Sequence, residues 1–189
     1  MKERFLNNCI SFVKSNNIEL RYGLEGIYLT FGKFLIIFPL AFLLGIFKEF
    51  ILTLIFFNII RYPAFGIHAN KSSTCLFSSI LILVGIPLLM SKITITLPVK
   101  IAICIITFIC FILYAPADTV KRPLTNKRKR ILRKIATCII AIIYSVIIII
   151  FNNNDISIYL LSGMIIETIL ILPITYRIYG MPYRNYLMV

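Results

Sequence analysis

The sequence has no tryptophan, one histidine and only 7 acidic residues against 20 basic ones. Its 5 cysteines include no CxxC pair and their number is odd, so neither a zinc site nor a closed set of disulfides is predicted. The basic residues flank apolar runs and do not alternate with exposed aromatic residues, which argues against nucleic acid as a partner. We therefore expect no metal and no cofactor.

Apolar residues are abundant instead. They make up 60% of the 189 residues, well above the roughly half that is typical of soluble domains. A spanning helix needs about 20 residues, so this length accommodates about six spans and little else. The sequence predicts an all-α, polytopic membrane helix bundle with about six transmembrane helices, which forms a single domain over residues 1–189.

The apolar runs define the predicted spans. Residues 1–26 carry apolar side chains at helical spacing near their start, which predicts an N-terminal amphipathic helix at the membrane surface. The run Phe50–Ile60 is only about two-thirds as long as a crossing, so it is either a short span or a partly re-entrant helix. Full spans are predicted for Phe31–Phe47, Thr74–Met90, Leu97–Ala115, Ile135–Phe151 and Ile156–Tyr176.

Loop charges predict the orientation. The segment 116–134 is rich in Lys and Arg and is therefore predicted to be cytoplasmic, whereas Asn152–Asp155 carries no positive charge and is predicted to be outside. Counting spans back from the basic loop places the polar stretch Arg61–Ser73 and both termini in the cytoplasm. If Phe50–Ile60 does not cross, the N-terminus moves outside. Either way, we expect a multi-pass protein of the plasma membrane.

The single histidine, His68, lies seven residues before Cys75. A thiol needs a base to become a nucleophile near neutral pH, and histidine is suited to that task. Seven residues of continuous helix would separate the two by about 10 Å, so contact requires a loop between them, which Gly66 and the polar residues after His68 supply. Cys75 would then lie in the first turn of a helix, where the dipole favours a thiolate. The alternative is that His68 is an ordinary loop residue and Cys75 a small apolar one.

Other ionisable groups carry two interpretations each. Asp118 either orients the histidine as a third catalytic residue or acts as a cap or turn residue. Glu167 lies near the middle of the last predicted span, where a carboxyl needs a partner, so it is either functional or bonded to a neighbouring helix. The remaining cysteines are expected to be packing or structural residues: Cys9, Cys104, Cys110 and Cys138.

One stretch of the chain is similar to a known family. Within RYPAFGIHANKSSTC the chain resembles the signature of the accessory gene regulator protein B (AgrB) family, at Arg61, Gly66, His68, Ala69 and Cys75. The later run APADTVKRP and the basic residues after it resemble the family's cytoplasmic loop, and the six-span outline agrees over nearly the whole chain. The sequence departs from the family at Phe65, where many members have a second glycine.

The resemblance implies a membrane cysteine endopeptidase of quorum sensing. It removes the C-terminal tail of a small AgrD-like propeptide, which has an amphipathic leader and an acidic tail. His68 and Cys75 are the implied catalytic dyad, and the acyl group is held on the cysteine as a thioester before a nucleophile in the peptide closes a thiolactone ring. Arg61 and Gly66 are implied to support processing through an electrostatic contact and a loop conformation. A homodimer is also implied.

The basic residues have two possible uses. They either bind the acidic tail of the propeptide or only set the orientation and contact anionic membrane lipids. The residues concerned are Lys121, Arg122, Lys127, Arg128, Lys129 and Arg130. From another class of function, a transporter or exporter of a small peptide is the main alternative to a peptidase, because Lys33 and Glu167 at membrane depth could line a path. A non-catalytic membrane scaffold is the third interpretation.

Overall fold

The computed structural model describes residues 18–67, 72–119 and 123–187, with the side chains of all of these except 18–30, 72, 73 and 75. Over these ranges the chain is helical and contains no strand apart from one isolated bridge between Phe65 and Ala117. The predicted all-α class is therefore confirmed. The chain divides into two compact units, Met1–Gly45 and Ile46–Val189.

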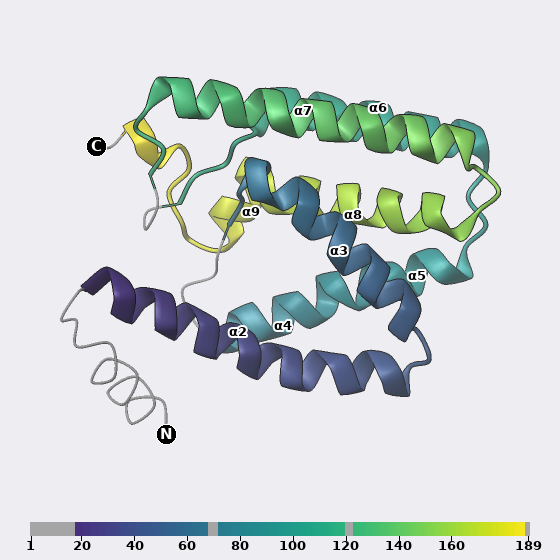
Figure 1. Ribbon diagram of the computed structural model, residues 1–189, viewed down its shortest axis with the longest axis horizontal. Helices are drawn as coiled ribbons and strands as arrows, with labels where there is room; N and C mark the ends of the chain where they lie inside the picture. The colour runs from purple at the N-terminus through teal and green to yellow at the C-terminus, as the bar shows by residue number, and fades with distance from the viewer. Residues whose placement is uncertain (1–17, 68–71, 120–122, 188–189) are drawn as a thin grey trace. The chain divides into compact units, whose positions relative to one another are not determined.

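The first unit contains one described helix, α2 (Ile18–Leu43). It continues without interruption from Ile18 into the apolar run that starts at Phe31, so the two are one helix (Figure 1). The predicted span that starts at Phe31 is too long at its other end, because Gly45 adopts a φ of +69°, with which a helix does not continue. The amphipathic segment 1–26 lies mostly outside the described residues and stays a prediction.

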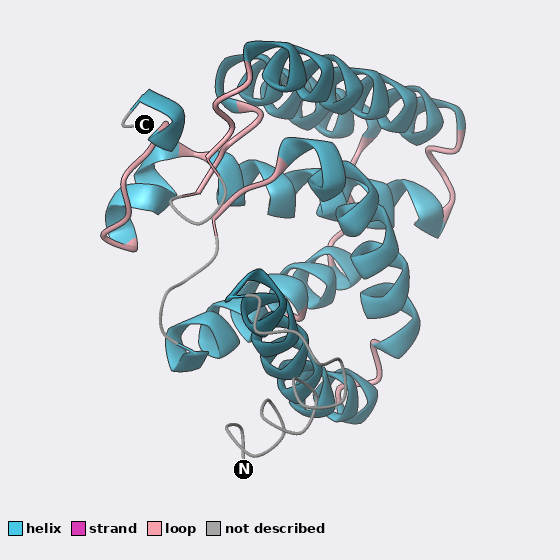
Figure 2. Ribbon diagram, turned by 60° about the vertical axis from the view of Figure 1, so that its left-hand side comes forward, coloured by secondary structure: helices cyan, strands magenta, loops and turns pink. Residues whose placement is uncertain are grey.

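The second unit holds the remaining helices. These are α3 (Phe47–Ala64), α4 (Ser72–Leu83), α5 (Gly85–Lys92), α6 (Leu97–Tyr114), α7 (Lys127–Ile150), α8 (Asp155–Ile171) and α9 (Pro173–Ile178), followed by the short 3-10 helix η1 (Asn185–Leu187). Helices α6 and α7 lie side by side, and α8 packs against both of them as well as against α3 and α5 (Figures 1 and 2). Most of α8 is buried, as is expected of a helix that is apolar on all sides.

Two described helices, α6 and α7, are long and apolar enough to cross a membrane. The predicted span Leu97–Ala115 corresponds to α6 within one residue at its end. Helix α3 contains the whole of Phe50–Ile60 within 18 residues, which corresponds to about 27 Å. It also includes Arg61, so the loop predicted over Arg61–Ser73 is shorter than expected and starts at Phe65.

The predicted span Thr74–Met90 is divided into α4 and α5 at Val84. Pro87 explains the interruption, because proline lacks an amide hydrogen and its ring clashes with the carbonyl four residues earlier, here that of Leu83. Neither part alone has the length of a crossing. The predicted count of about six transmembrane helices is therefore not established by helix length.

The last predicted span is divided in the same way between α8 and α9. Leu172 has a ψ of 137°, because the residue before a proline is driven out of the helical region, and Pro173 then begins α9. The hydroxyl of Thr175 donates to the carbonyl of Ile169, an acceptor that the interrupted helix leaves free. The chain then leads to the C-terminal segment, where Tyr186 lies against Arg130 near the start of α7 (Figure 1).

Helix α7 begins inside the basic segment 116–134, which the sequence assigned wholly to a loop. Asn126 caps it, because its Oδ1 accepts from the backbone amides of Arg128, at 3.0 Å, and Lys129, at 3.3 Å. The basic residues that follow are therefore helical, and the predicted span Ile135–Phe151 is only the apolar part of a 24-residue helix.

Candidate functional site

The chain between α3 and α4 leads to His68, and its described part turns sharply at Gly66. Gly66 has a φ of +122°, a conformation that L side chains rarely adopt. A Cβ at this position would lie 2.8 Å from Nη1 of Arg61 and 3.4 Å from Oε1 of Glu167. The backbone conformation therefore favours glycine here, and a Cβ would also have to displace the guanidinium of Arg61.

Arg61 fixes the turn from inside the last turn of α3. Its Nη2 donates to the carbonyl of Ile67 at 3.0 Å, and its Nη1 donates to that of Phe65 at 3.3 Å. The guanidinium also lies over the ring of Phe57, at 5.3 Å from its centroid. One side chain thus binds the carbonyls on both sides of Gly66, immediately before His68.

Glu167 of α8 provides the negative charge for this arginine. Its Oε2 accepts from Nη1 of Arg61 at 3.3 Å, and the side chains are 0% and 16% exposed, respectively. A carboxylate buried to this extent needs its cation, because a charge left alone in such a place is costly. The other carboxylate oxygen, Oε1, accepts no hydrogen bond from the residues that the structure describes. The hydrogen bond to a neighbouring helix, one of the two interpretations of Glu167, is therefore present, and a functional role stays a prediction.

Backbone hydrogen bonds join the same turn to two distant segments. The amide of Gly66 donates to the carbonyl of Ala117 at 2.9 Å, and the amide of Ala117 donates back to Ala64 at 2.9 Å. The amide of Ile67 donates to the carbonyl of Leu170, near the end of α8, at 3.2 Å. The backbone before His68 is thereby attached to α8 and to the chain after α6.

Asp118 follows directly and has the contacts of a turn residue. Its Oδ1 accepts from the amide of Asn185 at 2.9 Å, and its Oδ2 accepts from the amides of Tyr186, at 2.8 Å, and Leu124, at 3.2 Å. Tyr176 donates its buried hydroxyl to the carbonyls of Ala117 and Asp118 at 3.1 and 3.0 Å. Asp118 therefore ties the C-terminal segment to the loop, and a contact with His68 stays a prediction.

The two residues of the predicted dyad are placed only in part. Cys75 is the fourth residue of α4, in its first turn, which is the position that the sequence predicted for it. Its side chain and the whole of His68 lie outside the described residues, so their mutual geometry stays a prediction. One turn after Cys75, the hydroxyls of Ser78 and Tyr179 bond to each other and join α4 to the end of α9.

The structure describes only some of the basic residues named from the sequence. Lys121 and Arg122 lie outside the described residues, whereas the cluster from Lys127 to Arg130 forms the first turn of α7. Three of these four side chains are exposed, and the fourth, Arg130, stacks at 3.8 Å over the ring of Tyr186. No group of three or more metal-binding side chains occurs in the described part of the chain.

Sequence reasoning missed Arg133 and the structural role of Tyr176. Arg133 of α7 donates to the carbonyl of Tyr62 at 2.9 Å and lies 4.1 Å over the ring of Phe65, so it holds the same turn from the outside. Nothing in the sequence separates Arg133 from its basic neighbours. Cys104, expected to be a packing residue, is indeed buried in the core.

Similarity to known proteins shows which family the chain belongs to. The family described as Accessory gene regulator B matches residues 6–171. The chain belongs to this family. It is 31% identical over 169 residues to a protein named as AgrB-like in Clostridium acetobutylicum, a match that covers 89% of this chain and 81% of the relative.

Further members of the family come from staphylococci. The accessory gene regulator protein B of Staphylococcus aureus is 32% identical over 157 residues, covering 83% of each chain. That of Staphylococcus epidermidis is 31% identical over 160 residues, covering 83% of this chain and 80% of the relative. No solved structure matches. Membership in the AgrB family implies a role in quorum sensing and, together with α6 and α7, indicates a membrane protein.

Proposed function

We propose that this protein is a multi-pass membrane cysteine endopeptidase that removes the C-terminal tail of a small quorum-sensing propeptide. The proposal rests on one observation: Arg61, Glu167 and Gly66 fix the backbone immediately before His68. A general base must be held within hydrogen-bond reach of its nucleophile, and a turn held at both carbonyls by one buried ion pair is a means to do so. The Arg61–Glu167 ion pair therefore holds the backbone beside the proposed base.

In the proposed reaction His68 takes the proton of the Cys75 thiol, and the thiolate attacks the carbonyl carbon at the cleavage site. The peptide C–N bond breaks, the leaving amine receives the proton from His68, and the tail departs. The remaining peptide is then bound to Cys75 as a thioester. The start of α4 supports this step, because the free backbone amides in a first helical turn favour the thiolate over the thiol.

The second step closes a ring. A thiol within the bound peptide attacks the thioester, forms a thiolactone and releases Cys75. Exchange between thioesters changes little in free energy, so a site with little water favours cyclisation over hydrolysis. Arg61, Gly66 and Glu167 are positioning residues in this scheme, because they act on the backbone that leads to His68 and not on the substrate.

The substrate is a propeptide with an amphipathic leader and an acidic tail. We propose that Lys121, Arg122 and the Lys127 to Arg130 cluster bind that tail, which is supported by the exposure of most of the described cluster. The functional protein in this proposal is a homodimer of the plasma membrane with about six spans. Both termini and the loop with His68 are on the cytoplasmic side.

Co-expression with the propeptide tests the reaction directly. Wild type, Cys75→Ala and Cys75→Ser are compared by mass spectrometry of the peptide products, with Cys110→Ala as the matched loss of another thiol from the middle of a helix. Wild type and Cys110→Ala should release the tail and yield a cyclic peptide, and Cys75→Ala should not. If all four proteins process the peptide equally, the peptidase proposal fails and the transporter interpretation replaces it.

A further inference from the structure

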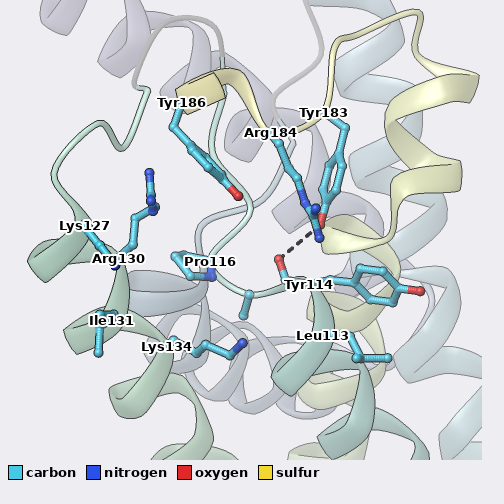
Figure 3. Close-up of a pocket in the computed structure, with 11 residues that line it drawn as sticks. Leu113, Tyr114, Pro116, Lys127, Arg130, Ile131, Lys134, Tyr183, Arg184 and Tyr186 are labelled. Carbon is cyan, nitrogen blue, oxygen red and sulfur yellow. Dashed lines mark hydrogen bonds between the residues drawn. The ribbon is translucent and has the colours of Figure 1, made fainter. Parts of the chain in front are cut away.

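A pocket of about 240 Å³ lies between the end of α6, the first two turns of α7 and the C-terminal segment (Figure 3). The residues that line it come from these three segments: Leu113, Tyr114, Ala115, Pro116, Lys127, Arg130, Ile131, Lys134, Tyr183, Arg184 and Tyr186. Most of this lining, including Lys134 and Arg184, does not belong to the residues discussed above for the peptidase reaction.

The pocket is strongly positive. Lys127, Arg130, Lys134 and Arg184 line it, and the lining includes no acidic residue. None of the four forms an ion pair with any carboxylate in the described part of the chain. The pocket also lies at the N-terminal end of α7, where the helix dipole adds positive potential. The ligand it fits is therefore an anion.

The C-terminal wall of the pocket is held rigidly in place. Asp118 accepts the backbone amides of Asn185 and Tyr186, and this positions Arg184, whose φ of 57° is rare for a residue other than glycine. Figure 3 shows the hydroxyl of Tyr183 bonded to the carbonyl of Tyr114, at 3.4 Å. Burial raises the pKa of Tyr183, which keeps this hydroxyl protonated as a donor.

The position of the pocket identifies the kind of anion. Both helices that are long and apolar enough to cross a membrane have one end here, the last turn of α6 and the first turns of α7. Leu113 and Ile131 of the lining are 56% and 48% exposed, so apolar surface continues from the pocket along these helices. Three tyrosines in the lining are typical of the headgroup level of a membrane. Cations beside exposed apolar side chains match a phosphate attached to acyl chains.

We propose that this pocket binds the phosphate headgroup of an anionic phospholipid, with the acyl chains against Leu113 and Ile131. Basic pockets between membrane helices are known to bind such headgroups. A soluble anion would use the cations but not the apolar flank. An acidic peptide would be drawn to the exposed Arg128 and Lys129, which do not line the pocket. The pocket shares Lys127 and Arg130 with the cluster proposed to bind the propeptide tail, but lipid binding does not depend on the proposed peptidase reaction.

The test uses the full-length protein in a neutral detergent and native mass spectrometry with added phosphatidylglycerol. Wild type should retain a bound phosphatidylglycerol, whereas phosphatidylcholine and glycerol 3-phosphate should bind far more weakly. The variant Lys134→Gln with Arg184→Asn should bind phosphatidylglycerol roughly tenfold to thirtyfold more weakly. Asparagine is chosen at position 184 because it tolerates a positive φ.

The matched control is Arg128→Gln with Lys129→Gln, which also removes two positive charges, from the first turn of α7, but changes no residue that lines the pocket. This control should bind phosphatidylglycerol within about twofold of wild type, and Lys134→Arg should bind it fully. Equal losses in both double variants would mean unspecific attraction and overturn the proposal. So would equally tight binding of glycerol 3-phosphate, or displacement of the lipid by an acidic propeptide tail. If the double variant does not fold, Lys134→Gln against Lys134→Arg gives the same comparison.

Discussion

Two cations, the buried Lys100 and the partly buried Arg61, lie near the two ends of α8, and their partners differ. Lys100 donates from Nζ to the carbonyl of Asn152 at 2.6 Å and to the hydroxyl of Ser157 at 2.8 Å, so its acceptors are neutral. Arg61 is paired with the carboxylate of Glu167 and also binds two carbonyls of an irregular turn. Lys100 closes a short connection between helices, whereas Arg61 determines the backbone conformation before His68.

The difference shows two uses of a cation with little solvent exposure. Ser157 also donates to the carbonyls of Asn152 and Asn154, so the turn at Lys100 has bonds of its own and does not depend on the lysine. The turn at Gly66 has an unusual φ and relies on Arg61 for the carbonyls on both sides. Removing the first cation should therefore affect stability slightly, and removing the second should affect both stability and processing.

The largest effect is expected on breaking the Arg61–Glu167 pair. Arg61→Met or Glu167→Met alone should lower the free energy of unfolding by about 3 kcal/mol or more, because each leaves an unpaired charge in a buried place. Either change should also abolish propeptide processing. Chemical unfolding in detergent and co-expression with the propeptide measure the two effects.

The double variant Arg61→Met with Glu167→Met sharpens this prediction. It should be less destabilised than the sum of the single variants, because neither charge is then left alone. Processing should nevertheless stay lost, since the carbonyls of Phe65 and Ile67 have no donor. Additive losses of stability would contradict the pairing of the two residues.

Gly66→Ala should have the next largest effect. The Cβ would have to displace the guanidinium of Arg61 at a backbone conformation that costs about 1–3 kcal/mol for other residues. Processing should fall strongly while the protein still inserts into membranes. Gly85→Ala is the matched control, because that glycine lies in α5 with nothing within 4 Å of an added Cβ. Equal processing by both variants would argue against a constraint at Gly66.

A smaller effect is expected for Tyr176→Phe. It removes the hydroxyl that donates to the carbonyls of Ala117 and Asp118, at a cost of about 1 kcal/mol. Because Ala117 also accepts from Gly66, processing should decrease without being lost. The thermal midpoint and the rate of tail release check the two effects separately, and an unchanged rate would show that this bond is not needed for the turn.

The smallest effect is expected for Lys100→Met. Methionine keeps most of the volume and removes a cation whose acceptors are neutral, so the change should cost about 1 kcal/mol or less. Tail release should equal that of wild type. If Lys100→Met lost as much processing as Arg61→Met, the different partners of the two cations would not explain their roles. The contrast drawn between Lys100 and Arg61 would then be wrong.

Sequence alone predicted the helical class and, within one residue, the bounds of α6, whereas the supporting roles that the family resemblance implies for Arg61 and Gly66 stay predictions. It also indicated that a carboxyl at Glu167 needs a partner, but it did not indicate which one. The two residues are 106 positions apart, and only the packing of α3 on α8 brings them together. The attachment of Asn185 and Tyr186 to Asp118 was missed for the same reason, since contacts between distant segments leave no periodic pattern.

Local signals explain the other differences. Pro87 and Pro173 divide two predicted spans. Both prolines stand in the sequence, but the spans were predicted from the length of the apolar runs. The start of α7 was missed because Asn126 precedes a run of charges, and hydropathy alone assigns such a run to a loop. A capping asparagine followed by good helix formers would have predicted the helix correctly.

The cap at Asn126 has a thermodynamic consequence for whatever anion approaches this end of the molecule. Ordering a flexible chain costs about 1–2 kcal/mol per residue in backbone entropy, and a partner of a basic loop would have to overcome that cost on binding. Here the backbone of the basic residues that follow Asn126 is already ordered when the protein folds. Association therefore involves mainly side chains, and more of the electrostatic attraction remains available as affinity.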